Sequence, residues 1–198
     1  MQSAKSTSVS EEMALSQGRR GELLPATEGR LFPSLRPLWS RLKCTCGYDI
    51  RLARTVRQHD LVSSLVRRMY AWRGYSTESL AHRPDDPNRL TLAAWQCDEL
   101  AATLTLGRDG PQGLQTDALY ARELASLRHP GRVLCEVSRL AVDPDFSSPD
   151  LLGTLFQSAL RHAREIFSAS DFVIGVNPRH AGYYRRRMGF HQIGKLQQ

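Results

Sequence analysis

The sequence predicts an α/β (α+β) fold, in which a mixed central sheet is flanked by helices on both of its faces. Three observations support this prediction. Segments with apolar residues at helical spacing alternate along the chain with short apolar runs that are typical of strands. The run at 172–176 is continuously apolar, as expected of a strand that is covered on both faces. The runs at 90–96 and 100–106 are separated by three residues, which is short enough for a hairpin.

The amino-terminal part differs in composition from the rest of the chain. Residues 1–43 are rich in Ser, Gly, Pro and mixed charge and have no sustained period, so we expect a disordered or loosely docked leader. The globular domain is therefore expected at 44–198, and it begins with a strand at 48–54. Thr55 can cap a helix over 55–73, because the apolar positions of that segment form one stripe.

The middle of the chain contains the strand that raises the functional question. Thr116 can cap a short helix over 117–128, and a central strand is expected at 133–142. Polar and charged residues interrupt this otherwise apolar strand, namely Glu136, Ser138 and Arg139. A buried strand does not carry such residues without a reason, since buried charges must be paired.

The last third of the chain has the clearest helix signals. Ser148 followed by Pro149 is an N-cap with proline at the first helical position, and apolar residues then repeat at three and four through Phe167. After the apolar strand at 172–176, Asn177 and Pro178 open another helix, which Gly189 ends. A fragment at 190–193 is a further candidate strand.

Composition and charge limit the classes of function. The chain has 198 residues, a net charge of +7 and a pI near 9.6, which implies attraction to an anionic partner such as nucleic acid, acidic lipid or an acidic protein. The arginines are not interleaved with aromatic residues in a nucleic-acid-binding module, so we expect no nucleic-acid partner. No apolar run reaches the ~20 residues of a transmembrane helix, and the amino terminus has no apolar signal region. We therefore expect a soluble, cytoplasmic protein.

Cysteine usage agrees with that location. Four cysteines are too few for a disulfide scaffold of this length, and we expect reduced thiols. Cys44 and Cys46 lie close together but lack the second pair that makes a zinc signature specific, so no metal site is predicted.

Several motifs resemble one family of enzymes. EVSRLAVDP at 136–144 and NPRH at 177–180, closed by Gly189 and Phe190, are similar to the GNAT acyltransferase superfamily. More narrowly, they resemble the N-acyl amino acid synthases of FeeM type, which are relatives of the acyl-homoserine-lactone synthases. The similarity covers roughly 48–194, with a weaker signature at 68–70 (RMY).

The resemblance implies a GNAT-like sheet in which the parallel strands at 133–142 and 172–176 splay apart. It also implies an acyl group carried as a thioester on phosphopantetheine, which is a co-substrate and not a permanently bound cofactor, and passed to the amino group of an amino acid. Pantetheine would lie between the splayed strands and pair with exposed backbone, as an added strand does. On this basis the expected acyl-donor contacts are Leu140, Ala141, Val142, Asn177 and His180.

The donor is expected to be an acyl carrier protein rather than coenzyme A. Acetyltransferases that use coenzyme A follow this strand with a glycine-rich loop whose N–H groups hold the pyrophosphate. Here the loop reads DFSSPD at 145–150, in which Pro149 has no N–H and two aspartates repel phosphate. A carrier protein is acidic and lacks the ADP group, and the segment from Pro178 onward has no acidic residue. The expected docking residues are Arg179, Arg185, Arg186 and Arg187, unless they only offset the dipole of their helix.

The chemistry suggests roles for the polar residues of the central strand. Glu136 is the candidate base that takes the proton of the attacking amine, and Ser138 is a candidate donor to the oxyanion. Arg139 and Arg68 are candidates for binding the substrate carboxylate. The resemblance implies that Tyr184 protonates the departing thiolate. As alternatives, Glu136 pairs with Arg139 for structural reasons, and Tyr184 is a core residue.

Alternation along the strand predicts which side chains share a face. Glu136 and Ser138 are expected on one face with Leu134 and Leu140, whereas Arg139 points the other way unless a bulge re-aims it.

Other functions stay open at this stage. The same scaffold could serve an acyl-coenzyme A-dependent N-acetyltransferase, a lactone synthase that uses S-adenosylmethionine, or a non-catalytic acyl-carrier-binding protein. The last reading draws on Thr105, where the resemblance implies an arginine, and on a chain that stops before the usual last strand.

Overall fold

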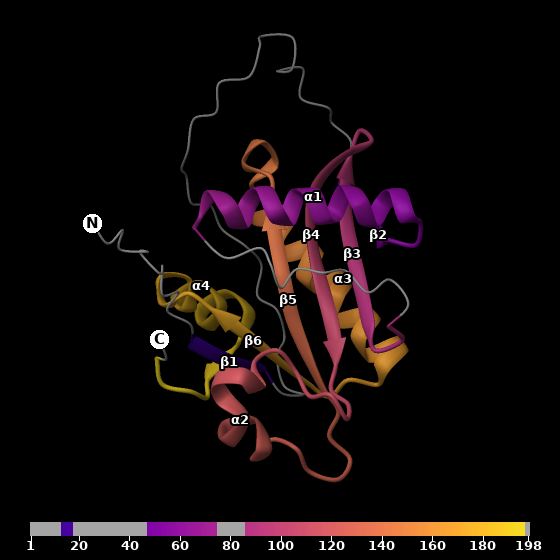
Figure 1. Cartoon of the computed structure of the whole chain (residues 1–198). Coiled ribbons are helices and arrows are strands. Elements are labelled where there is room, and N and C mark those ends of the chain that lie inside the picture. Colours follow the sequence, from indigo (N-terminus) through magenta and orange to yellow (C-terminus); the bar gives the residue numbers. More distant parts are fainter. Residues whose placement is uncertain (1–12, 18–46, 75–85, 197–198) are drawn as a thin grey trace, which may run out of the picture.

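The computed structural model describes residues 13–17, 47–74 and 86–196, and these form one sheet with the strand order β2-β3-β4-β5-β6-β1-β7 (Figure 1). Strands β5 and β6 are parallel, and each of the other neighbouring pairs is antiparallel. The predicted mixed sheet is therefore confirmed. The strands are β1 (Met13–Gln17), β2 (Asp49–Leu52), β3 (Arg89–Gln96), β4 (Glu99–Arg108), β5 (Leu134–Val142), β6 (Asp171–Val176) and β7 (His191–Gln192).

Helices cover both faces of this sheet, as predicted. Helix α1 (Val56–Trp72) packs across β4 and β5 on one face, and α3 (Pro149–Phe167) packs against β3 and β4 on the opposite face (Figure 1). Helix α2 (Asp117–Ala125) shares the face of α1, and α4 (Pro178–Met188) joins the core beneath α3. None of the helices in the described part of the chain is long and apolar enough to cross a membrane.

Local sequence signals set the helix ends. The hydroxyl of Thr55 accepts the N–H of Gln58, whose side chain in turn accepts the backbone N–H of Thr55, so the two form a capping box at the start of α1. The hydroxyl of Ser148 accepts the N–H of Leu151 ahead of Pro149. Gly189, with φ of +66°, ends α4 in the left-handed conformation that glycine adopts without steric cost.

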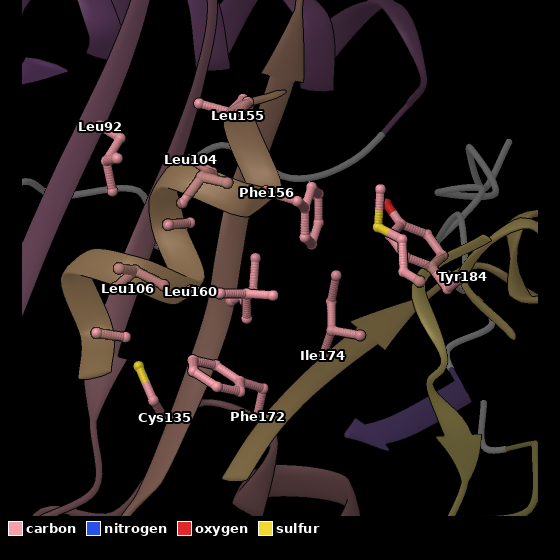
Figure 2. Packing of buried hydrophobic residues seen from close by; sticks show 14 of the residues in the cluster. Leu92, Leu104, Leu106, Cys135, Leu155, Phe156, Leu160, Phe172, Ile174 and Tyr184 are labelled. Atoms are coloured by element: carbon pink, nitrogen blue, oxygen red, sulfur yellow. The ribbon is translucent and has the colours of Figure 1, made fainter. Parts of the chain in front are cut away.

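The main core lies between the sheet and α3. Its side chains include Leu104 from β4, Phe172 and Ile174 from β6, and Phe156 and Leu160 from α3 (Figure 2). Complete burial of one such side chain contributes about 1.5–3 kcal/mol, so this layer is the main source of stability.

The amino-terminal segment gives the first correction. The leader was expected to be disordered or loosely docked over 1–43, but Met13–Gln17 form β1, which lies between β6 and β7. Ala14 and Leu15 are completely buried there. The domain therefore includes a strand that the predicted boundary at residue 44 left out, while 1–12 and 18–43 lie outside the described residues.

The cysteines give the second correction. Cys97 is disulfide-bonded, so the expectation that all cysteines are reduced thiols is wrong. Cys44 and Cys46 lie outside the described residues. Cys135 is a free thiol buried beside Leu106, and burial raises its pKa to about 12 (Figure 2). Such a thiol is a core residue and not a nucleophile.

Candidate active site

Strands β5 and β6 separate halfway along their length (Figure 1). Their ladder runs from Leu134 opposite Asp171 to Val137 opposite Ile174 and ends there. Beyond this point β5 stays paired with β4, while β6 stays paired with β1. The predicted splay of two parallel strands is confirmed.

A cavity of about 150 Å³ lies at this separation, and we call it the wedge cleft. Its walls come from β5, β6, the end of α1 and the start of α4. Among the described residues no carboxylate belongs to this lining, so the charged side chains there are cationic. The lining residues are Tyr70, Arg73, Val137, Ser138, Arg139, Leu140, Ile174, Gly175, Val176, Asn177, His180 and Tyr184.

A β-bulge shapes the wall that β5 gives to the wedge cleft. Thr103 of β4 faces Ala141 and Thr105 faces Ser138, so β5 has one extra residue between these pairs. Arg139 is at this bulge, and its backbone has a φ of +51°. As a result Leu140 packs toward the core under α3, and the expectation that it shares a face with Glu136 is wrong.

Glu136 lies below the point of separation and faces α2. Its side chain is buried, and it accepts the N–H of Gln115 at 2.8 Å, the N–H of Thr116 at 2.9 Å and the hydroxyl of Thr116. Thr116 was expected to cap α2 with that hydroxyl, but it makes no cap hydrogen bond and donates to Glu136 instead. These donors, and not Arg139, are the hydrogen-bond partners of Glu136.

Burial sets the proton affinity of Glu136. Loss of solvent raises the pKa of its carboxyl group above the ordinary value, although the donors from Thr116 and Gln115 and the charge of Arg89 act in the opposite direction. A carboxylate with a raised pKa is a stronger proton acceptor than an exposed one.

A second cavity, of about 460 Å³, opens on the other side of Glu136, and we call it the polar pocket. It lies at the ends of β3 and β4 that are near α2. Sequence reasoning missed this pocket and its arginine, Arg89. The lining residues are Asp86, Pro87, Asn88, Arg89, Gly107, Arg108, Gly110, Pro111, Gln112, Gly113, Leu114 and Glu136.

Arg128 fixes the loop that forms one wall of the polar pocket. Its guanidinium donates to both carboxylate oxygens of Asp109 and of Asp117, at 2.6 to 3.1 Å. Asp117 also accepts the N–H of Leu114 at 2.7 Å. These bonds hold residues 109–117 in one shape, because bidentate charged hydrogen bonds are directional.

Ser138 lies close to Glu136 on β5 but lines the other cavity. It is two residues beyond Glu136 on β5, and it lines the wedge cleft. Its hydroxyl lies 3.5 Å from the carbonyl oxygen of Thr105, whose own hydroxyl is 3.2 Å from that of Thr91. The hydroxyl groups of Thr91, Thr105 and Ser138 therefore form a row across β3, β4 and β5. This row lies two residues further along β5 than Glu136.

The two arginines predicted to bind substrate occupy different places. Arg139 is half-buried in the wall of the wedge cleft, and burial followed by the charge of Arg89 lowers its pKa. Arg68 instead pairs with Asp143 at 2.5 Å and ties α1 to the end of β5. It lines neither the wedge cleft nor the polar pocket.

The predicted contacts from β6 and α4 reach the wedge cleft. Tyr184 is packed between Phe156 and Phe190, and burial raises its pKa, so it stays a neutral phenol (Figure 2). His180 lies near the mouth, and burial together with Arg179 and Arg73 lowers its pKa. Asn177 caps α4 and lines the cleft as well.

The remaining predicted residues have simpler positions. Ala141 is buried under α1, and Val142 packs toward the core under α3, so both offer only backbone to a ligand. Arg179, Arg185 and Arg186 are exposed on α4, and Arg187 is partly exposed.

The start of α3 is closed to a pyrophosphate. Pro149 is the first helical residue and has no N–H, and the hydroxyl of Ser148 already takes the N–H of Leu151. The hydroxyl of Tyr48 lies 3.4 Å from that of Ser148. Asp145, ahead of α3, and Asp150, in its first turn, are both exposed, and their charges repel phosphate.

Comparisons with known proteins can be set beside this geometry. The family model described as N-acyl amino acid synthase FeeM matches residues 61–198. The solved structure of FeeM, an N-acyl amino acid synthase from uncultured soil microbes, is 33% identical to this chain with a TM-score of 0.69, and the match covers 76% of this chain and 82% of that one.

More distant structures share the fold. A GCN5-related N-acetyltransferase from Ralstonia eutropha is 16% identical with a TM-score of 0.56, over 77% of this chain and 97% of that one. A predicted acetyltransferase with acetyl-CoA from Clostridium acetobutylicum is 12% identical with a TM-score of 0.53, and the match covers 73% of this chain and 90% of that one. A comparison with curated proteins found no match.

Proposed function

This chain belongs to the family of FeeM N-acyl amino acid synthases, and we propose that it takes its acyl group from an acyl carrier protein and transfers it to the amino group of an amino acid beside the wedge cleft. The enzyme is thus an N-acyltransferase that uses an acyl thioester. The observation that carries the proposed site is the separation of β5 from β6 after Val137, with a cavity between them.

The reaction balances with groups that line the two cavities. The amine nitrogen attacks the thioester carbonyl carbon, a C–N bond forms, and the C–S bond breaks. Of the two protons that the ammonium group loses, one goes to Glu136 and then to solvent. Tyr184 gives its own proton to the departing thiolate, and the second proton of the amine then restores the Tyr184 phenol. The products are an N-acyl amino acid and the free thiol of phosphopantetheine.

The wedge cleft suits the pantetheine arm. Beyond Val137 the edge of β5 that faces β6 has no ladder partner among the described strands, and its backbone groups can pair with the two amides of the arm. In this proposal Leu140, Ala141 and Val142 offer backbone groups, while Asn177 and His180 contact the arm near the mouth. Ser138 would donate to the oxyanion from the adjacent wall.

The arginines have separate roles in this scheme. Arg139 lines the cleft and stays a candidate for the substrate carboxylate. Arg68 would act indirectly, because its pair with Asp143 positions α1 over the site. Arg89, in the polar pocket, is a second candidate for the carboxylate.

Two features favour a carrier protein over coenzyme A as the donor. The start of α3 offers no free N–H cradle for a pyrophosphate, and a carrier protein does not need one. The exposed arginines Arg179, Arg185 and Arg186, with Arg187 beside them, present positive charge on α4 near the mouth of the cleft. An acidic carrier protein is attracted to such a surface.

The donor can be tested directly. The purified protein is incubated with an equimolar mixture of the twenty standard amino acids and with dodecanoyl groups on either an acyl carrier protein or coenzyme A, and N-acyl products are measured by mass spectrometry. We expect saturable product formation with the carrier protein. Turnover with coenzyme A alone would overturn the proposed donor, and absence of product from both would overturn the proposed reaction for this acyl chain length.

A further inference from the structure

We infer that the polar pocket is the acceptor site and that it holds an amino acid as a zwitterion, with the carboxylate on Arg89 and the ammonium group on Glu136. This inference deepens the proposed function and rests on it. It assigns to Arg89 a contact that sequence reasoning gave to Arg139 or Arg68.

The strand register places the two charged residues on either side of a gap. Arg89 of β3 lies opposite Gly107 of β4, and Gly107 lies opposite Glu136 of β5. Neighbouring strands are about 4.8 Å apart, so the backbones at Arg89 and Glu136 are about 10 Å apart. A Cβ atom placed on Gly107 would meet nothing within 4 Å. The floor between the two charges is therefore open.

Arg89 keeps donors for a carboxylate. Its Nε lies 3.2 Å from the carboxylate of Asp86, and its two Nη groups make no hydrogen bond to the described residues. Those two groups form the planar fork that binds a carboxylate with two parallel hydrogen bonds. The side chain is 33% exposed, so a ligand can reach it without displacing the core.

Glu136 keeps one acceptor position for an ammonium group. A carboxylate has about four lone-pair sites, and three are taken by the two N–H groups and the hydroxyl of residues 115 and 116. Two of these donors share Oε1, so the remaining site is on Oε2. The bonds also hold the carboxylate in one orientation, which means that it is positioned before the substrate arrives.

The charges of the polar pocket match a zwitterion. Arg89 and Arg108 are opposed by Asp86 and Glu136, so the two signs balance within one cavity. In the wedge cleft the charged side chains among the described lining residues are all cationic, Arg139 included, so this cleft is the better match for the phosphate-bearing donor. This difference separates the two arginines: Arg139 lies on the donor side and Arg89 lies on the acceptor side.

The proposed site also delivers the amine to the thioester. Ser138 is the next residue of β5 on the same face as Glu136, about 7 Å along the strand, and it lines the wedge cleft. Arg89 lines the polar pocket, and its charge lowers the pKa of both Glu136 and Arg139. An amine held at Oε2 would therefore lie on the same face of β5 as the thioester carbon placed beside Ser138, two residues away along the strand.

Two variants test the site while keeping the fold. Gly107→Val places a β-branched residue in a strand where its Cβ meets open space, and Gly153→Ala is the control, because its Cβ on α3 also meets nothing within 4 Å but lines neither cavity. With dodecanoyl carrier protein and the amino acid mixture, we expect Gly107→Val to raise the KM for amino acids about tenfold or more. The KM for the carrier protein and the melting temperature should stay unchanged.

Arg89→Gln tests the carboxylate contact itself. Rates are compared for the amino acid mixture and for the mixture of the corresponding α-amides, which keep the amine and lack the carboxylate. We expect the preference of the wild-type protein for acids over amides to fall about tenfold or more in Arg89→Gln, because a charged bidentate contact is lost. The same preference should be kept in Arg139→Gln.

The outcomes separate this inference from the proposed function. If the wild-type protein makes no N-acyl product, the proposed function fails first. If it makes product but both Gly107→Val and Arg89→Gln keep the wild-type KM and acid preference, the polar pocket is not the acceptor site. Loss of the preference in Arg139→Gln alone would place the carboxylate in the wedge cleft instead.

Discussion

The wedge cleft and the polar pocket lie on either side of the same strand, yet they are built differently. The wedge cleft arises where β5 and β6 stop pairing, and its wall includes the bulge at Arg139. The polar pocket arises where loops cover the ends of β3 and β4, and Gly107 leaves its floor open. Among the described lining residues, the charged side chains of the wedge cleft are all cationic, whereas those of the polar pocket have both signs.

This difference assigns the two substrates of an acyl transfer to two cavities. A thioester on a long, amide-containing arm needs free backbone and positive charge, which the wedge cleft offers. An amino acid needs one positive and one negative group at short range, which the polar pocket offers. Glu136 of the polar pocket and Ser138 of the wedge cleft are neighbours on one face of β5, so our proposal brings the amine and the thioester to the same part of this strand.

Removal of the carboxylate of Glu136 is expected to have the largest effect. Glu136→Gln should lower kcat by about 10²- to 10⁴-fold, the usual contribution of a general base, while the KM for the carrier protein stays near the wild-type value. Steady-state kinetics measure both parameters. A loss of less than about threefold would contradict the role as base and would leave Glu136 as the structural partner of Thr116.

The pH dependence sharpens the same point. The pKa of Glu136 is raised by burial above the ordinary glutamate value of 4.5, and only the ionised form can accept a proton. We therefore expect kcat/KM to fall as the pH drops through that raised pKa, and to recover as the pH rises above it. This fall of kcat/KM at low pH should be absent in Glu136→Gln. If the variant keeps it, the fall comes from the titration of another group.

Tyr184→Phe, a change in the wedge cleft, is expected to lower kcat less than Glu136→Gln does. It should lower kcat about tenfold to a hundredfold, because the departing thiolate loses its proton donor, while the ring keeps its packing against Phe156 and Phe190. An acyl thiophenol ester, whose thiolate leaves without protonation, should narrow the gap between variant and wild type. An equal loss with both donors would point to a packing role.

Charge reversal on α4 tests the surface beside the cleft. Arg185→Glu combined with Arg186→Glu should raise the KM for acyl carrier protein several-fold and leave turnover of free acyl-pantetheine unchanged. Arg122→Glu combined with Arg161→Glu changes the net charge equally on exposed parts of α2 and α3 and is the matched control. Equal effects of the two pairs would mean that overall charge, and not docking on α4, attracts the carrier.

The smallest effect is expected outside both cavities. Arg68→Ala removes the ion pair with Asp143, in which the arginine is largely exposed, so the free energy of unfolding should fall by less than about 1 kcal/mol. Urea denaturation measures this change. The KM for amino acids should stay the same, and a clear increase would restore Arg68 as a direct substrate contact.

Local signals explain why much of the fold was predictable. Capping residues such as Ser148 and Asn177 act on the next few residues, so they locate α3 and α4 without knowledge of the tertiary structure. The polar interruption of β5 also pointed correctly to the strand that borders both cavities. These signals depend only on neighbours in the chain.

The features that sequence reasoning missed depend on distant partners. Met13–Gln17 is too short to show a period, and it becomes a strand because β6, far along the chain, offers an edge. The importance of Arg89 depends on the register that sets it across Gly107 from Glu136. The role of the Thr116 hydroxyl also depends on a distant partner. It donates a hydrogen bond to the buried carboxylate of Glu136 on β5 and therefore does not cap α2.

The central claim is that the thioester arm lies between β5 and β6, and a crystal structure with a dodecanoyl-pantetheine amide tests it most directly. The account predicts electron density for the arm along residues 138–142 of β5, with the acyl carbonyl beside Ser138. Density at another location in the protein, with β5 and β6 joined beyond Val137, would contradict it.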